Sequence, residues 1–147
     1  MESNSLDKII NKKKENLNLL KNKFSIRDLN NKIDKFDKYL DFKKKIYSNY
    51  LKGKYSLIAE IKKASPSAGI IIQDYNPVNI ATIYQKKKAT CLSVLTEEDF
   101  FKGSLEHISK IKEEVNLPIL CKDFFIDKFQ IPLSRSFGAD AILLIVA

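Results

Sequence analysis

The sequence is poor in the residues that build several common functional sites. Among its 147 residues there are no tryptophans, one histidine, two cysteines, four glycines and four prolines. A metal site or a serine–histidine–aspartate triad that uses more histidine than His107 is therefore excluded. Cys91 and Cys121 lie in apolar, strand-like runs and form no CxxC pair, which indicates buried thiols in a reducing compartment and not a disulfide framework.

Long apolar runs are also missing. No run reaches the roughly 18 residues of a membrane span. The N-terminal stretch "MESNSLDKII" lacks the basic region and apolar core of a secretory signal. We therefore expect a cytoplasmic protein with no membrane partner.

Acidic residues are outnumbered, with 18 Asp and Glu against 26 Lys and Arg, for a formal net charge of +8. Such a balance attracts nucleic acid, membrane surfaces and small phosphorylated anions. The lysine runs "NKKKEN", "DFKKKIY" and "QKKKAT" are, however, typical of solvated helix faces and linkers. No motif with interleaved aromatic residues accompanies them, so we expect no nucleic-acid partner.

The part of the chain before Gly53 contains no glycine or proline and is polar. Apolar residues at near-helical spacing predict an amphipathic helix over residues 5–22. The stretch "SIRDLNNKID" interrupts it, and a second helix is predicted over residues 33–50. We interpret residues 1–52 as a helical N-terminal extension.

Residues 53–147 alternate between strand and helix patterns. The predicted strands cover residues 55–62, 91–96, 117–124 and 139–147, and the predicted helices cover residues 76–89, 103–115 and 127–138. This alternation, with nearly continuously apolar strands, predicts an α/β fold with a parallel sheet. Right-handed crossovers then bring the carboxyl ends of all strands to one side, where α/β proteins bind ligands.

Charged residues follow two of these strands at that side. Because side chains alternate along a strand, Glu60 and Lys62 share one face of the first strand, and Lys122 can point into the same site from the third. A structural ion pair at the end of a sheet would explain the same residues, and the pattern alone leaves both interpretations open.

Four linked motifs resemble the successive strand and loop signatures of the indole-3-glycerol-phosphate synthase family: "AEIKKASPS", "SVLTEEDFFKGS", "LPILCKDFFID" followed by "FQI", and "GADAILLIVA". The resemblance covers about residues 56–147, and a helical N-terminal extension is also typical of the family. It implies the N-terminal portion of a (β/α)₈ TIM barrel, with about four parallel strands present.

The family belongs to tryptophan biosynthesis and is a carboxy-lyase. It converts 1-(2-carboxyphenylamino)-1-deoxyribulose 5-phosphate to indole-3-glycerol phosphate with loss of CO₂ and water. The resemblance implies that this phosphorylated, anthranilate-derived molecule is the substrate and that no metal or organic cofactor is needed.

The resemblance also assigns roles to individual residues. Lys122 resembles the general acid that protonates the substrate carbonyl oxygen, Lys62 the lysine that holds the substrate carboxylate, and Glu60 the carboxylate that orders this lysine. Ser65 resembles a phosphate-side contact. The apolar wall around the aromatic ring would consist of Phe101, Phe124, Pro66 and Leu143.

A complete (β/α)₈ barrel needs roughly 250 residues, and this sequence has 147. We therefore expect residues 53–147 to form its first half. We also expect the chain to be a fragment or a truncated gene product that is inactive alone.

Two alternatives remain open from the sequence: a different phosphate-binding barrel enzyme, and a degenerate half-barrel that binds without catalysis. In some organisms the family is fused to phosphoribosylanthranilate isomerase, which leaves open an association with another tryptophan-pathway enzyme.

Overall fold

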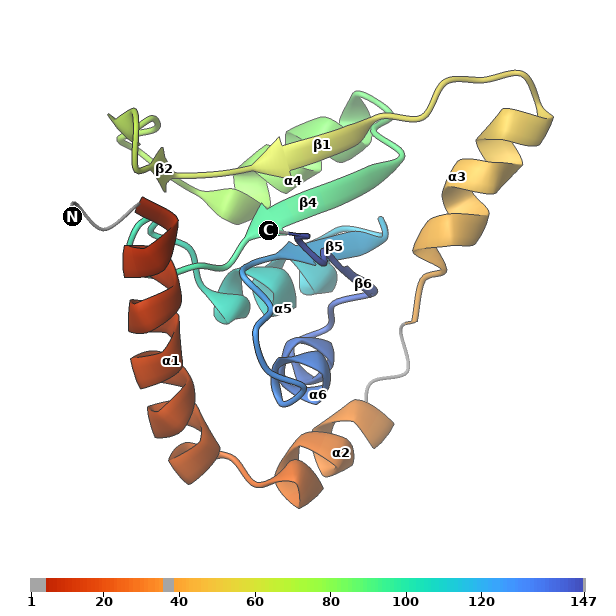
Figure 1. Ribbon diagram of the computed structural model, residues 1–147. Helices are drawn as coiled ribbons and strands as arrows, with labels where there is room; N and C mark the ends of the chain where they lie inside the picture. The colour runs from red at the N-terminus through yellow and green to blue at the C-terminus, as the bar shows by residue number, and fades with distance from the viewer. Residues whose placement is uncertain (1–4, 36–38, 147) are drawn as a thin grey trace.

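A four-stranded parallel sheet forms the centre of the computed structural model, which describes residues 5–35 and 39–146 (Figure 1). The strands lie side by side in the order β1-β4-β5-β6, so each strand pairs with the next of the sheet along the chain. Their bounds are Ile58–Ile61 (β1), Cys91–Leu95 (β4), Ile119–Lys122 (β5) and Ala141–Ile142 (β6). This sequential parallel order confirms the predicted α/β fold and is that of part of a (β/α)₈ barrel.

Three helices connect these strands: α4 (Pro77–Lys86), α5 (Leu105–Glu114) and α6 (Gln130–Ser136). The sequence predicted each of them, with ends a few residues too long. The Asn76 side chain accepts a hydrogen bond from the backbone N–H of Asn79, and Pro77 occupies the first position of α4. Ser104 caps α5 in the same way, through the N–H of Glu106.

One face of the sheet packs against the connecting helices and forms the main hydrophobic core. Alternate strand residues point to this face, and they contact the apolar sides of α4 and α5. The buried core includes Ile61, Leu92, Val94, Ile119, Cys121, Ala81, Ile108 and Ile111. The opposite face carries Glu60, Ser93 and Leu120 side by side, because the strand register pairs Glu60 with Ser93 and Ser93 with Leu120.

The N-terminal helices are α1 (Ser5–Lys23), α2 (Ile26–Asp34) and α3 (Phe42–Leu51). In Figure 1 they form an arc, with α1 to the left of the sheet, α2 below it and α3 to its right. The first helix was predicted, but the interruption at residues 25–34 was wrong, because α2 occupies it. Ser25 and Asp28 form a reciprocal capping box that starts α2. The predicted helix over residues 33–50 was also wrong in its start, since α3 begins after the N-cap Asp41; residues 36–38 lie outside the described residues.

The first two helices dock on α6. Leu17 of α1, Leu29 of α2 and Phe129 and Leu133 at α6 form a second buried cluster. The division between an extension of residues 1–52 and a barrel portion of residues 53–147 stays a prediction, although a turn at Gly53 (φ +64°) separates α3 from β1.

Two short strands that the sequence did not predict follow β1. β2 (Ala64–Ser65) and β3 (Gly69–Ile70) pair in antiparallel fashion as a separate hairpin. Conversely, of the strand predicted over residues 139–147, only Ala141–Ile142 forms ladder pairs among the described residues 139–146, and residue 147 lies outside the described residues. None of the helices in the described ranges has the length and apolar character needed to cross a membrane.

Candidate active site

A single carboxylate joins the two lysines that the sequence placed together. Lys62 Nζ lies 3.0 Å from Glu60 Oε1, and Lys122 Nζ lies 2.8 Å from Glu60 Oε2. All three side chains are about one-third exposed, with values of 31%, 32% and 35% for Lys62, Glu60 and Lys122. The cluster is therefore reachable from solvent but not freely solvated.

The strand register explains how Lys122 reaches Glu60, although β4 lies between β1 and β5. Glu60 is level with Ser93, and Lys122 is paired with Leu95, two residues further toward the carboxyl ends of the strands. Residues two apart on a strand point to the same face. The lysine side chain therefore crosses over β4 on the face away from the helices and ends at the glutamate.

The two lysines of this cluster keep the Glu60 carboxyl ionised. Partial burial of Glu60 opposes its ionisation, but the hydrogen bonds from Lys122 and Lys62 outweigh this effect and hold the pKa of its carboxyl below the ordinary value. Glu60 is therefore ionised at neutral pH, and both ammonium groups have a fixed position.

Two predicted aromatic wall residues also come together. The rings of Phe101, in the loop after β4, and Phe124, in the loop after β5, contact each other with centroids 6.3 Å apart and planes tilted by 43°. Both side chains are half-buried. They form an apolar pair at the carboxyl ends of adjacent strands.

The loop that carries Phe101 is held by a buried glutamate. The Glu97 side chain is 1% exposed, and its carboxylate accepts hydrogen bonds from the backbone N–H groups of Asp99, Phe100 and Phe101 at 2.7–3.1 Å. Gly103 closes the loop against β4, where an added Cβ would lie 2.3 Å from the carbonyl oxygen of Leu95. This loop is therefore fixed by its own hydrogen bonds.

The remaining predicted site residues lie elsewhere. Ser65 is in β2, and its hydroxyl accepts a hydrogen bond from the N–H of Ala68; Pro66 is exposed in the turn of the same hairpin. Leu143 follows β6 and is half-buried. Within the described residues, no hydrogen bond or ring contact joins these three to the Glu60 cluster, so their roles stay predictions.

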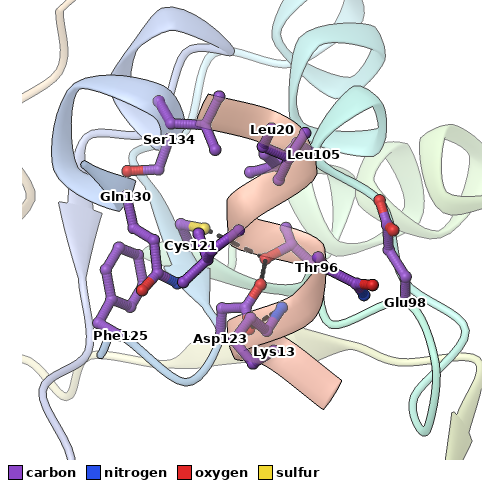
Figure 2. A pocket seen from close by; sticks show the side chains of 13 residues that line it. Lys13, Leu20, Thr96, Glu98, Leu105, Cys121, Asp123, Phe125, Gln130 and Ser134 are labelled. Atoms are coloured by element: carbon purple, nitrogen blue, oxygen red, sulfur yellow. Dashed lines mark hydrogen bonds and ion pairs between the residues drawn. The ribbon is translucent and has the colours of Figure 1, made fainter. Parts of the chain in front are cut away.

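Sequence reasoning missed a residue that supports this end of the sheet. Lys13 of α1 forms an ion pair with Asp123, which directly follows Lys122 (Figure 2). Asp123 also accepts a hydrogen bond from the Thr96 hydroxyl at 2.9 Å, and Thr96 lies 3.3 Å from Cys121 Sγ. These residues surround a small cavity of about 30 Å³ between α1 and the ends of β4 and β5.

The interpretation of "NKKKEN" as a solvated helix face was therefore wrong for one of its lysines. Lys13 is only 8% exposed, whereas Lys12 and Lys14 on either side of it are exposed. Three lysines in a row carry no signal that distinguishes the middle one. Only the helical phase set by Ile9 and Leu17, both buried on the same side of α1, would have identified it.

The arrangement suits the binding of an anion and the transfer of a proton. Two lysines held at the carboxyl ends of parallel strands can bind acidic groups of a ligand and donate a proton to an oxygen near them. The aromatic pair can position a flat apolar group. The described residues contain no cluster of three His, Cys, Asp or Glu side chains that could hold a metal ion.

Comparisons with known proteins point to one family. A sequence profile of the family described as "Indole-3-glycerol phosphate synthase" matches residues 6–147. A curated relative of that name from Trichodesmium erythraeum is 46% identical over 144 residues, covering 98% of this chain and 48% of the relative. A relative of the same name from Aliarcobacter butzleri is also 46% identical over 144 residues, covering 95% of this chain and 53% of the relative. The chain thus spans about half the length of the curated relatives it matches.

Proposed function

The chain belongs to the indole-3-glycerol phosphate synthase family, and on that premise we propose that Glu60, Lys62 and Lys122 form part of an active site that makes indole-3-glycerol phosphate. The proposed substrate is 1-(2-carboxyphenylamino)-1-deoxyribulose 5-phosphate, which closes to an indole ring with loss of CO₂ and water. This would make the protein a carbon–carbon lyase of tryptophan biosynthesis that acts in the cytoplasm.

The observation that carries the proposal is the pair of contacts from Glu60 to Lys62 and Lys122. A lone ion pair at the end of a sheet would need one lysine. The second ammonium leaves the cluster with a net positive charge, which suits a substrate that carries a carboxylate and a phosphate. Each lysine keeps donors that its single contact with Glu60 does not use.

In this proposal Lys122 is the general acid. It protonates the substrate carbonyl oxygen while the ring carbon attacks the carbonyl carbon, and Glu60 holds the ammonium group in place. Lys62 binds the substrate carboxylate and takes part in the later dehydration. The two lysines reach one carboxylate from the ends of different strands, which supports separate roles for them.

The apolar part of the substrate needs a wall that orients it over the reacting carbon. Phe101 and Phe124 supply it, with Pro66 and Leu143 as further contacts, and Ser65 contacts the phosphate. The ring contact between Phe101 and Phe124 supports the first pair. For Pro66, Leu143 and Ser65 the proposal rests on the family's motifs alone.

We propose that full turnover also needs groups outside these four strands, because the relatives are about twice as long as the segment they share with this chain. Residues 1–147 alone would then bind an anthranilate-like ligand weakly and form no product.

The experiment is an assay of indole-3-glycerol phosphate formation by the full-length enzyme that contains this segment. We expect Lys122→Ala to lower kcat by about 10²- to 10⁴-fold, the contribution of a positioned general acid. Lys128→Ala is a matched control, because Lys128 is an exposed lysine in the loop after Phe124. Unchanged turnover in a folded Lys122→Ala variant would refute the general-acid role.

The alternative of a half-barrel that binds without catalysis makes a different prediction for the same assay. No product would then form from any length of the chain, and a basic surface would bind nucleic acid with an affinity that falls steeply with salt. Saturable binding of an anthranilate-like ligand without such salt-dependent binding favours the synthase.

A further inference from the structure

A second group of basic side chains lies on the other side of the sheet from the Glu60 cluster. Lys62 turns toward Glu60, whereas Lys63 lies over the ring of Tyr75, with its Nζ atom 6.0 Å from the ring centroid. Tyr75 packs against the core formed by the helices and the helix-facing side of the sheet. Lys62 and Lys63 are thus adjacent in sequence but lie at two separate sites.

The second place is a groove of about 490 Å³ between the N-terminal ends of α4 and α5. Three separate segments contribute basic groups to it: the end of β1, the loop after β4, and the first turns of α5. The residues that line it are Lys63, Lys102, Lys110, His107, Tyr75, Asn76, Pro77 and Val78. This set, all of it described in the structure, contains no carboxylate.

Lys102 is fixed at the groove by the shape of its loop. Its φ is +55°, in the left-handed region that non-glycine residues rarely adopt. The Glu97 hydrogen bonds on one side and the close approach of Gly103 to Leu95 on the other keep the loop in this form. The lysine is therefore presented by a rigid segment and not by a solvated helix face.

The wall of the groove also contains polar atoms without partners. The rings of Tyr75 and His107 contact each other at 5.5 Å, and the Tyr75 hydroxyl and His107 Nδ1 are buried without a hydrogen-bond partner in the described structure. Unpaired buried polar atoms are costly. A ligand oxygen that accepts a hydrogen bond from the Tyr75 hydroxyl would offset part of this cost.

We propose that this groove is a second anion site, which binds a phosphate group outside the active site. Three ammonium groups supply up to nine N–H donors around a space of this size, and a tetrahedral dianion accepts several such bonds at once. The first residues of α4 also line this space, so the positive end of the α4 dipole adds to its potential. The ligand is inorganic phosphate or the phosphate of a small phosphomonoester.

His107 is a built-in reporter because it is the only histidine of the sequence. Burial, and next the nearby charge of Lys110, lower the pKa of its imidazole, with Lys63 adding to this and Glu106 opposing it. A bound dianion reverses the local potential. Phosphate bound in the groove therefore raises the pKa of His107.

The test follows the imidazole signal of His107 by NMR while inorganic phosphate is added to the chain at constant ionic strength. We expect a saturable shift, which Lys102→Gln and Lys110→Gln each weaken about tenfold in apparent affinity. Both lysines are exposed, so these variants keep their fold. Lys128→Gln, a lysine outside the groove, is the matched control and keeps the affinity.

Three results would overturn the proposal. Chloride at the same ionic strength could give the same shift, which would indicate screening only. The two groove variants could bind as tightly as the parent chain. Lys62→Gln or Lys122→Gln could abolish the shift, which would place the phosphate at the Glu60 cluster. Repeating the titration with a simple phosphomonoester decides between the two ligand sources. If the ester gives no shift, the groove excludes it and the ligand is inorganic phosphate.

Discussion

Lys13 and Asp123 form an ion pair with 2.7 Å between Nζ and Oδ1, although each side chain is only 9% exposed. One belongs to the first helix and the other follows directly after Lys122 at the end of β5. The N-terminal extension is thus tied to the strand that carries the proposed general acid. The loss of either partner leaves a charge buried without compensation, which is far more costly than the loss of a surface pair.

The first prediction concerns this pair. We expect Lys13→Met to lower the free energy of unfolding by about 3–5 kcal/mol, because it leaves the Asp123 carboxylate buried without its cation. Lys14→Ala, at the exposed next position, should change it by less than about 0.5 kcal/mol. Urea unfolding followed by circular dichroism measures both values.

A double-mutant cycle tests the cause of that loss. Lys13→Met combined with Asp123→Asn removes both charges. The asparagine oxygen can still accept the hydrogen bond from the N–H of Phe124, and its NH₂ group can donate to the Thr96 hydroxyl in place of the bond that Asp123 accepts there. The double variant should therefore lose less stability than the two single losses added together. Strict additivity would mean that the two charges do not interact.

The second prediction concerns the loop at Glu97. Glu97→Ala removes an acceptor shared by three backbone N–H groups and should cost about 3 kcal/mol of stability. It should also release Phe101 and Lys102, so that hydrogen exchange of residues 99–103 speeds up. Glu113→Ala, at an exposed helix position, serves as the control. Equal hydrogen exchange of residues 99–103 in the two variants would contradict the proposal that Glu97 holds this loop.

The third prediction is a pH dependence. Because burial and Lys110 hold the pKa of His107 below 6.5, the folded chain binds fewer protons there than the unfolded chain does just below pH 6.5. Stability should therefore rise with pH across that window and level off above it. Thermal melts between about pH 5.5 and 7.5 measure how stability changes with pH, and His107→Gln should remove this dependence. If the dependence persists in the variant, other groups cause it.

The fourth prediction concerns the two thiols. Burial raises the pKa of Cys91 to about 11 and that of Cys121 to about 12, and both are free and buried. Neither should react with a thiol reagent at pH 8 in the folded chain, since the thiolate is the reactive form. Both should react in urea. Rapid labelling of one thiol in the native chain would show that its strand opens.

The sequence alone supplied much of the barrel portion, for identifiable physical reasons. Buried parallel strands are continuously apolar, and Asn76 followed by Pro77 is typical of a helix start, so β4, β5 and α4 were predicted. Alternation placed Glu60, Lys62 and Lys122 on one face, and the contacts among them agree with that placement.

The N-terminal helices were harder to predict because their signals are weak. The capping box of α2 uses Asp28 where glutamate or glutamine is usual, so residues 25–34 looked like an interruption. The helical phase of Ile9 and Leu17 places Lys13 on the buried side of α1, but its partner Asp123 lies in a distant part of the chain, and no local pattern encodes that contact. The same holds for the groove at Lys102, which three segments build together.

The contact between Glu60 and Lys122 also works as a check on strand alignment. It spans an intervening strand, and it forms only when β1, β4 and β5 are each in the observed register. A slip of β1 by one residue would turn Glu60 into the apolar core beside the helices, where an unpaired carboxylate is strongly disfavoured. The charges proposed to act on the substrate therefore also select against misaligned sheets during folding, before any ligand is present.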